Sequence, residues 1–499
     1  MNRINQRCRR STKRVRTMTN LPLILMIGAV LMAGRRSATV TAATSSASSS
    51  LTSNPEGCVT DYDEAAGVDY FPDKAVVEYA TTFNVEYFLS YKVLTMIGSP
   101  TSTYVLYQCG TPQPVLNTTV QQYIQVPVTN VSTGTPDHIP RIELLGHRDS
   151  IVAYTGNVEN IGSPCVDALV DNGTIVQALT LDAECEQDIV DNEALIEASV
   201  EVAFGDSLLT SYCENASMVI NGVQVLTYAE SGDTIGLGHG EAIKLFSLFY
   251  NEEARGNELF DEIETLWFCT ENNAQTCSVE LEDSPTVAWF PYLPTDVSSA
   301  FDPAGSGYGA PSNGTFYEQA ITGAGGTFVY CGEFPAFTLM TDEEMLACFA
   351  DADVCVMAAD YEEVEQFFNM SALSQLACFQ NETLYDITLS GVNTWFEAKS
   401  VEPHVLIEDM VVAIHGDDYD FGIGDYERLL LRNVFTESSG TGTYYADVGT
   451  CDDPDAVVEL QGECEELVDL GQCSPAPRTV PHALSAVVLA LGAAAAFLW

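Results

Sequence analysis

The chain has 499 residues and carries 71 Asp/Glu against 19 Lys/Arg. Nine of the Lys/Arg lie in residues 1–36, so the other ten face every acidic residue and give residues 37–499 a net charge near −61. Such a surface repels nucleic acid and anionic lipid, which makes both poor partners. Two explanations of the acidity stay open: solubility in a salty medium that screens self-repulsion over about 10 Å or less, or attraction of cationic ligands or metals.

The N-terminus is typical of a secretory signal peptide. Seven Lys/Arg lie in the first 17 residues, and the apolar run Leu21–Gly34 that follows is too short to span a bilayer comfortably. Small residues come next and predict cleavage after Ala42 or Ala43, so that 1–43 is the signal peptide. An uncleaved signal anchor is the alternative, favoured by Arg35-Arg36. Residues 44–74 are predicted to be a low-complexity linker.

Short strands and helices alternate over 75–239, which predicts a parallel α/β sheet and a first lobe. The predicted strands are Ala75–Tyr79, Tyr91–Ile97, Tyr104–Gln108, a short one from Tyr123, Ile151–Tyr154, Val200–Phe204 and Gln224–Tyr228. The predicted helices are 136–146, 164–170 and 192–199.

Helical periodicity then extends over 240–270 and predicts one long connecting helix. A second lobe follows over 283–436, with the same alternation. Its predicted strands are 285–290, Thr327–Tyr330 and Val354–Ala358, and its predicted helices are 315–322, 341–350, 371–377 and 403–415.

The last 63 residues divide into two parts. Residues 437–482 are acidic and contain cysteines, and we predict a stalk. Residues 483–499 are uncharged and mostly apolar, with no basic residue after them. Together with the small residues Gly471 and Ser474 and a polar spacer, this end matches a glycolipid-anchor signal, and a short membrane helix is the alternative.

Fourteen cysteines remain after the leader residue Cys8, and no Cys-x-x-Cys occurs among them. In a secreted chain disulfides are the default, whereas zinc ribbons and thioredoxin-type sites are excluded. The close pairs Cys269/Cys277 and Cys348/Cys355 are candidates, although connectivity cannot be read from one sequence. Asn-x-Ser/Thr sites predict N-glycosylation at the surface, at Asn117, Asn130, Asn172, Asn215, Asn313, Asn369 and Asn381.

Six passages are distinctive: Val93-Leu-Thr-Met-Ile, Tyr104-Val-Leu-Tyr-Gln-Cys-Gly-Thr-Pro, Ile142-Glu-Leu-Leu-Gly-His-Arg-Asp-Ser-Ile-Val-Ala-Tyr, Asn257-Glu-Leu-Phe-Asp-Glu-Ile-Glu, Gly323-Ala-Gly-Gly-Thr-Phe-Val and the segment Asn381–Gly416. They resemble passages of the substrate-binding proteins of bacterial iron–siderophore and cobalamin importers. Their order and spacing cover roughly 75–436. The run from Ile235 to Ala242 departs from the family, because it keeps Glu241 but lacks the Arg and Trp that relatives often carry there.

The resemblance implies two parallel-sheet α/β lobes joined by a long helix, with a ligand buried between the lobes. It implies a siderophore, haem or cobalamin-like ligand and a membrane transporter or receptor as partner. No catalysis and no cofactor are expected. A non-transport adhesion or signalling module on the same fold remains the alternative.

One enzyme motif competes with this interpretation. Phe204-Gly-Asp-Ser-Leu208 spells the nucleophile block of an esterase class, but no His has Asp three positions before it, as that class needs. A secreted esterase is therefore a weak third hypothesis. Gly236-x-Gly238-x-Gly240 lacks the spacing and the Lys of a phosphate-binding loop, and no metal signature occurs.

Candidate ligand contacts follow from the rule that ligands in open α/β sheets bind beyond the carboxyl ends of strands. Aromatic side chains there would suit a bulky ligand, and acidic ones a cationic ligand or a partner. Ordinary packing or a solvated surface is the alternative for each residue. The candidates are Thr133, His138, Tyr154, Glu230, His239, Glu241, Trp289, Tyr330, Glu333, Trp395 and Phe396.

Overall fold

The structure is a computed structural model. It describes residues 51–98, 100–182, 187–205, 223–228, 233, 235–281, 284–293, 307–309, 314–332, 339–367, 369–416, 421–424, 426–449, 451, 453, 456–467 and 473. The predicted signal peptide and the apolar C-terminal segment 483–499 lie outside these residues. Within the described part of the chain, no helix is both long and apolar enough to cross a bilayer.

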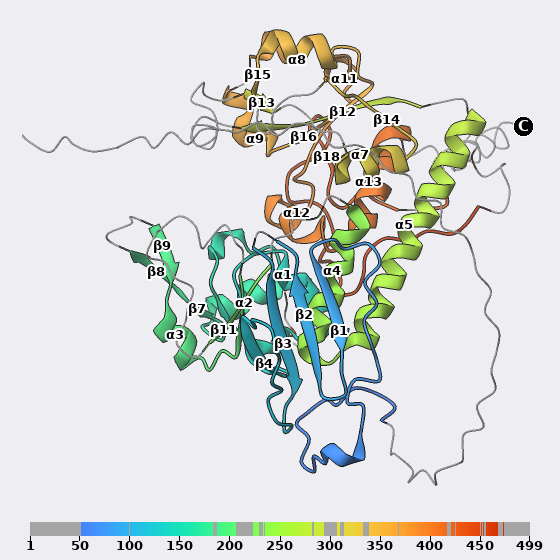
Figure 1. Ribbon diagram of the computed structural model, residues 1–499. Helices are drawn as coiled ribbons and strands as arrows, with labels where there is room; N and C mark the ends of the chain where they lie inside the picture. The colour runs from blue at the N-terminus through green and yellow to red at the C-terminus, as the bar shows by residue number, and fades with distance from the viewer. Residues whose placement is uncertain are drawn as a thin grey trace, which may run out of the picture. The chain divides into compact units, whose positions relative to one another are not determined.

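The described part of the first lobe contains a four-stranded sheet, a five-stranded sheet and a two-stranded ribbon (Figure 1). The leading sheet has the order β1-β2-β3-β4, in which β4 pairs parallel to β3 and the other pairs are antiparallel. Its strands are β1 (Phe83–Tyr87), β2 (Tyr91–Met96), β3 (Ser102–Gln108) and β4 (Gln122–Val126). The predicted strand Ala75–Tyr79 does not pair with a sheet, because the backbone N–H groups of Tyr79 and its neighbours bond to the Glu241 carboxylate instead.

The second sheet of this lobe is parallel throughout, as predicted. Its order is β11-β10-β5-β6-β7, and its strands are β5 (Val131–Thr133), β6 (Ile151–Tyr154), β7 (Val176–Gln177), β10 (Val202–Gly205) and β11 (Gln224–Thr227). The strands β8 (Leu179–Asp182) and β9 (Gln187–Val190) form a separate ribbon. The helices are α1 (His138–Leu144), α2 (Pro164–Asp171) and α3 (Asn192–Glu197). Ser163 caps α2 and Asp191 caps α3, each by accepting backbone N–H bonds.

The connecting element is two helices rather than the one predicted over 240–270. Helix α4 (Gly236–Tyr250) ends at Asn251, whose φ of 59° is left-handed, and α5 (Glu253–Leu281) begins directly after it. Asparagine adopts this conformation more readily than most residues, so it ends a helix that the apolar pattern alone would continue. Helix α5 packs against α4 and against helices α7 and α13 of the second lobe (Figure 1).

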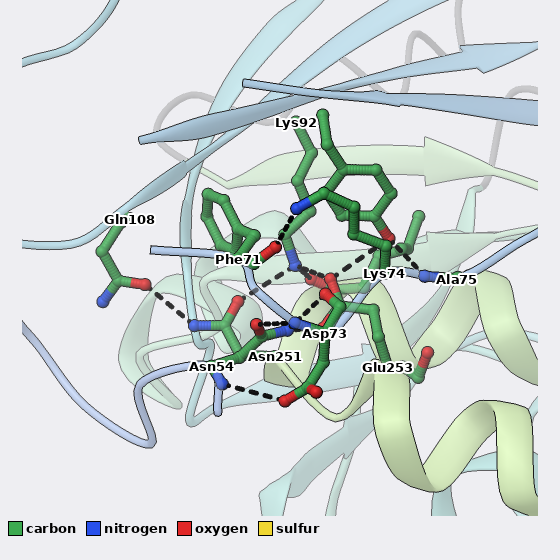
Figure 2. A network of polar contacts seen from close by, with 12 residues as sticks. Asn54, Phe71, Asp73, Lys74, Ala75, Lys92, Gln108, Asn251 and Glu253 are labelled. Atoms are coloured by element: carbon green, nitrogen blue, oxygen red, sulfur yellow. Dashed lines mark hydrogen bonds and ion pairs between the residues drawn. The ribbon is translucent and has the colours of Figure 1, made fainter. Parts of the chain in front are cut away.

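A buried polar network fixes the junction of α4 and α5 (Figure 2). The Lys92 ammonium of β2 pairs with the Glu253 carboxylate at 2.5 Å and donates to Asn251 Oδ1 at 3.0 Å. The Asn54 amide donates to the same Glu253 carboxylate at 2.6 Å. The segment 51–74, predicted as a linker, is therefore folded onto the lobe, and Phe71 in it is buried.

The second lobe is built on a mixed sheet of order β15-β13-β12-β16-β17-β18, with β14 beside β12. The central pairs β12–β16, β16–β17 and β12–β14 are parallel, and the outer pairs are antiparallel. The strands are β12 (Thr286–Leu293), β13 (Gly307–Gly309), β14 (Thr327–Phe328), β15 (Leu339–Met340), β16 (Val354–Ala358), β17 (Leu384–Asp386) and β18 (Arg432–Asn433). The helices are α7 (Phe316–Gly323), α8 (Asp342–Phe349), α9 (Tyr361–Val364), α10 (Met370–Leu373), α11 (Ala377–Gln380), α12 (Val392–Ala398) and α13 (Pro403–His415). The predicted class, two α/β lobes with parallel sheets joined through a long helix, is confirmed.

The described part of the predicted stalk packs onto the lobes instead of extending from them. Three disulfides tie it there: Cys165–Cys451, Cys269–Cys464 and Cys277–Cys473. Three more bonds join Cys58–Cys109, Cys331–Cys348 and Cys355–Cys378. Both candidate cysteine pairs were thus wrong. Cys269 and Cys277 lie eight residues apart on one straight helix, about 12 Å in rise, which is beyond the reach of a disulfide.

Candidate functional site

The carboxyl ends of β5, β6 and β10 meet at one edge of the parallel sheet. In the strand register Thr133 lies beside Tyr154 on one side and Phe204 on the other. Helix α1 starts just beyond β5 and places His138 over this edge, with its ring 6.3 Å from that of Phe204. Thr133, His138 and Tyr154 are all fully buried. The structure therefore brings together these three predicted residues, at the place where the sheet geometry predicts a ligand.

Helix α12 of the second lobe closes over this edge, and the resulting contact between lobes is called the seam below. Its Glu397 carboxylate accepts the backbone N–H of Gly162 at 2.7 Å and the hydroxyl of Tyr445 at 2.5 Å. Burial raises the pKa of Glu397 to about 8, against the lowering effect of these two bonds. Asn393, also on α12, donates to the carbonyls of Glu159 and Ile161. The two lobes thus meet through polar groups.

Tyr154 belongs to this seam. Burial, followed by the nearby Glu397 charge, raises the pKa of its phenol. Among the described residues, its hydroxyl has no hydrogen-bond partner although it is buried. A buried polar atom without a partner costs roughly 1–3 kcal/mol, so such atoms mark places where water or a ligand atom belongs. The Ser400 hydroxyl, also in the seam, has the same property.

Arg141 is a seam residue that the sequence analysis missed. Its guanidinium bonds to the Asp137 carboxylate at 2.7 Å and reaches the carbonyls of His239 and Ser400 at 3.3 Å. It therefore links α1, the start of α4 and the second lobe while fully buried. Burial works to raise the pKa of Asp137, but the charges of His138 and Arg141 outweigh it, and the net shift is downward. Only the rarity of Arg in this acidic chain hinted at such a role.

The structure describes one of the three acidic candidates, Glu241. The Glu241 carboxylate accepts three backbone N–H bonds, from Glu78, Tyr79 and Ala80, and pairs with Lys244 at 2.9 Å. The three N–H bonds hold the segment before β1 to α4, and the Lys244 pair lies within α4. These contacts are structural, and the role of Glu241 as a ligand contact stays a prediction. Glu230 and Glu333 lie outside the described residues. His239 is buried, with its ring 5.6 Å from Phe316.

The predicted aromatic contacts divide into buried and exposed ones. Trp289 stacks on Tyr317 at 4.3 Å and lies 5.9 Å from Trp395, and both tryptophans are buried. Phe396 is 50% exposed, and Tyr330 is 41% exposed beside the Cys331–Cys348 disulfide, away from the seam. Trp395 therefore lies on the helix that closes the seam, but its ring is packed against other rings rather than lining an open cleft.

The remaining sequence motifs have structural explanations where the structure describes them. A side chain at Gly240 would meet Pro403 and Ile263, so this glycine lets α4 pack closely against α13 and α5. Phe204 is buried in β10, and the following Asp206, Ser207 and Leu208 lie outside the described residues. Within the described residues, no group of three or more His, Cys, Asp or Glu could hold a metal ion.

The predicted glycosylation sites are at the surface where they can be seen. Asn117, Asn172, Asn369 and Asn381 are exposed, and Asn130 is half-buried. Asn215 and Asn313 lie outside the described residues.

No protein-family model matches the chain, and no curated protein matches it. Solved structures with partial similarity include a possible iron-binding (periplasmic solute-binding) protein from Staphylococcus epidermidis, at 12% identity and a TM-score of 0.41, covering 58% of this chain and 99% of that one. The periplasmic haem-binding protein HutB of Vibrio cholerae has 11% identity and a TM-score of 0.41, over 57% and 98% of the two chains. The periplasmic vitamin B12-binding protein BtuF of Vibrio cholerae has 10% identity and a TM-score of 0.38, over 58% and 97%.

Proposed function

We propose that this chain is a secreted, non-enzymatic binding protein that holds a small solute between its two lobes. The observation that carries the proposal is the seam, where the carboxyl edge of the parallel sheet meets α12. Ligands of open α/β sheets bind at this edge. The Tyr154 hydroxyl, buried there without a partner among the described residues, supplies a donor for a ligand atom. The Ser400 hydroxyl supplies a second one from the other lobe.

The ligand class we propose is an iron chelate, a haem or a cobalamin-like compound. Support comes from the ordered sequence resemblance over 75–436 and from the two-lobed fold. The seam is closed by direct contacts, so a bulky ligand enters only when the lobes part. Helix α5 packs on α7 and α13 of the second lobe and is tied to the first lobe by the Lys92–Glu253 pair and by a bond from Asn257 to the Lys74 carbonyl. Because a helix lacks the soft backbone hinge of crossing strands, we expect only a small change in scattering radius on binding.

A second candidate function is a rigid interaction module that binds no solute. The closed seam favours it: Arg141 bonds across to Ser400, Gly162 bonds across to Glu397, and the Cys165–Cys451 disulfide fixes the chain's last part to α2. Under this alternative the surface of the protein, rather than its seam, contacts a partner.

Fluorescence titration separates the two functions. The full chain would be titrated with ferric siderophores, haemin and cobalamin, following tryptophan emission that includes Trp395 on α12. Binding at the seam predicts quenching by one ligand class and a roughly five- to tenfold weaker affinity in Tyr154→Phe, because one hydrogen bond is lost. Tyr123→Phe on β4, outside the seam, is the matched control and should bind as the parent does. No response to the whole panel would leave the interaction module as the better explanation.

We also propose that the protein is displayed at a cell surface through its C-terminal segment and works with a membrane transporter or receptor. The proposal rests on the basic leader, the seven Asn-x-Ser/Thr sequences that predict glycosylation and the apolar end of the sequence. Treating cells with a phospholipase specific for glycolipid anchors should release the protein. A protein that stays on the membrane would indicate a membrane helix instead.

A further inference from the structure

A cavity lies on the first lobe, at the tip of the β1–β2 hairpin. Its volume is about 260 Å³. One wall is the loop 62–70 and the other is the hairpin tip 88–91. The side chains that matter for its chemistry are four aromatic rings and two carboxylates: Tyr62, Tyr70, Phe88, Tyr91, Asp63 and Glu64.

Both walls of this cavity are held in place. The backbone N–H of Tyr70 donates to the carbonyl of Leu89 at 2.7 Å, which joins the two walls. The hairpin closes with a bond from Phe88 N–H to the Tyr91 carbonyl at 2.8 Å, and the rings of these two residues stack at 4.5 Å. The Cys58–Cys109 disulfide anchors the loop that leads into the first wall. The cavity is therefore formed before any ligand arrives.

The charge of the cavity is negative. Asp63 and Glu64 line it, and residues 51–73 contain no Lys or Arg. The basic residues nearest in the sequence already have carboxylate partners: Lys92 is buried and pairs with Glu253 at 2.5 Å, and Lys74 pairs with Asp69 at 2.9 Å. Burial, followed by the charges of Tyr62 and Asp63, raises the pKa of the Tyr70 phenol. Aromatic faces with adjacent carboxylates are the environment that binds organic cations.

We propose that this cavity binds the ammonium head of a small organic cation, by cation–π contact with the rings and by attraction to Asp63 and Glu64. Its volume lies just below the range of about 300–1,000 Å³ that is usual for pockets holding whole drug-sized ligands, so it fits one headgroup. A net charge near −61 also concentrates cations at the surface. This site is independent of the solute proposed for the seam.

Calorimetric titration of the unaltered chain with choline tests the proposal, with 3,3-dimethylbutan-1-ol as a neutral compound of the same shape. We expect choline to bind at least about tenfold more tightly, since cation–π contacts and carboxylates act only on the charged head. Equal binding of the two compounds, or no choline binding, would overturn the proposal. N-acetyl-lysine methylamide represents a lysine side chain within a peptide. If it binds more tightly than choline, the ligand is a lysine of a partner protein, and the assignment to a small organic cation is overturned.

Two variants locate the site. Tyr62→Leu removes one ring. The double variant Asp63→Asn with Glu64→Gln removes the charge, while the amide oxygen introduced at the first position can still accept the Ala65 N–H that Asp63 caps. Each variant should weaken choline binding at least about fivefold. Phe268→Leu, at a partly exposed aromatic position on α5, is the control and should change nothing. Choline binding that survives both cavity variants would place the site elsewhere and contradict the proposal.

Discussion

Two buried polar regions of this protein neutralise their charges in different ways. At the α4–α5 junction, the Glu253 carboxylate faces the Lys92 ammonium, so charge meets charge. Around α12 and α13, buried carboxylates face phenols and backbone N–H groups instead. Glu397 is bonded by Tyr445, Glu402 by Tyr444, and Asp409 by Tyr426. A chain with so few cations can supply only some of its buried carboxylates with an ion pair.

The buried carboxyls around α12 and α13 make the stability of this region depend on pH. Burial raises the pKa of Glu397 to about 8 and that of Glu402 to about 7, from an ordinary 4.5. A carboxyl whose pKa is higher in the folded state favours folding when protonated. Its contribution is present in full below about pH 4.5 and is lost as pH rises through about 7 and 8. We therefore expect the second region to weaken toward alkaline pH.

We expect the largest loss of stability when the Lys92–Glu253 ion pair at the α4–α5 junction is broken. Lys92→Met leaves the Glu253 carboxylate buried without its cation, and we expect a loss of about 3–5 kcal/mol in the free energy of unfolding, measured by denaturant titration. The exposed pair Arg255–Glu258 is the matched control, because Arg255→Met should cost less than about 1 kcal/mol. A similar cost for both variants would contradict the buried geometry.

The next largest effect concerns the buried carboxyls around α12 and α13, which bond to phenols and backbone N–H groups. The free energy of unfolding of the parent chain should fall between about pH 5 and pH 8. Glu397→Gln, which resembles the protonated acid, should remove part of this fall, on the order of 3 kcal/mol for a shift of this size. Glu258→Gln at the surface should leave the slope unaltered. If the free energy of unfolding of the parent chain instead rises over this pH range, the buried carboxyls do not have raised pKa values.

The close approach of the two lobes at Gly162 can be tested by adding one methyl group there. A side chain at Gly162 would lie 2.7 Å from the Glu397 carboxylate and 2.9 Å from the Thr394 nitrogen. Gly162→Ala should therefore cost about 1–3 kcal/mol of stability in a thermal or denaturant melt. Gly57, where added atoms meet nothing within 4 Å, serves as the control, with an expected change within about 0.5 kcal/mol.

We expect the smallest effect from removing one of the phenol hydroxyls that bond to the buried carboxyls. Tyr445→Phe removes the hydroxyl that donates to Glu397 at 2.5 Å, and we expect a loss of about 1–2 kcal/mol. The loss should be larger at about pH 9 than at about pH 5, since the bond is stronger when the carboxylate is charged. A loss that does not vary with pH would show that Glu397 keeps one charge state across this range.

Regular elements of the fold could be predicted because their periodicity is local. The strands Ile151–Tyr154 and Val354–Ala358 and the helix Pro403–His415 have the bounds expected from the sequence. The break at Asn251 was missed because the apolar pattern continues through it. Ala75–Tyr79 has the composition of a strand, but the backbone N–H groups at its end, those of Glu78, Tyr79 and the following Ala80, bond to the distant Glu241 carboxylate.

The site was only partly predictable for a different reason. Thr133 and Tyr154 are the last residues of parallel strands and His138 comes soon after one, so their meeting at one edge follows from the topology. Arg141 and Glu397 bond to Ser400 and Gly162, which lie 259 and 235 positions away along the chain, and no local pattern encodes such contacts. The packing of the described part of 437–482 likewise depends on disulfides such as Cys165–Cys451, whose partners are 286 positions apart.

The central claim is that a solute is held at the seam, and native mass spectrometry of the full chain tests it most directly. The chain would be mixed with ferric siderophores, haemin and cobalamin together. We predict one bound ligand per chain from one chemical class, at reduced occupancy in Tyr154→Phe and at full occupancy in Tyr123→Phe. A spectrum with no adduct from any member of the mixture would contradict the claim.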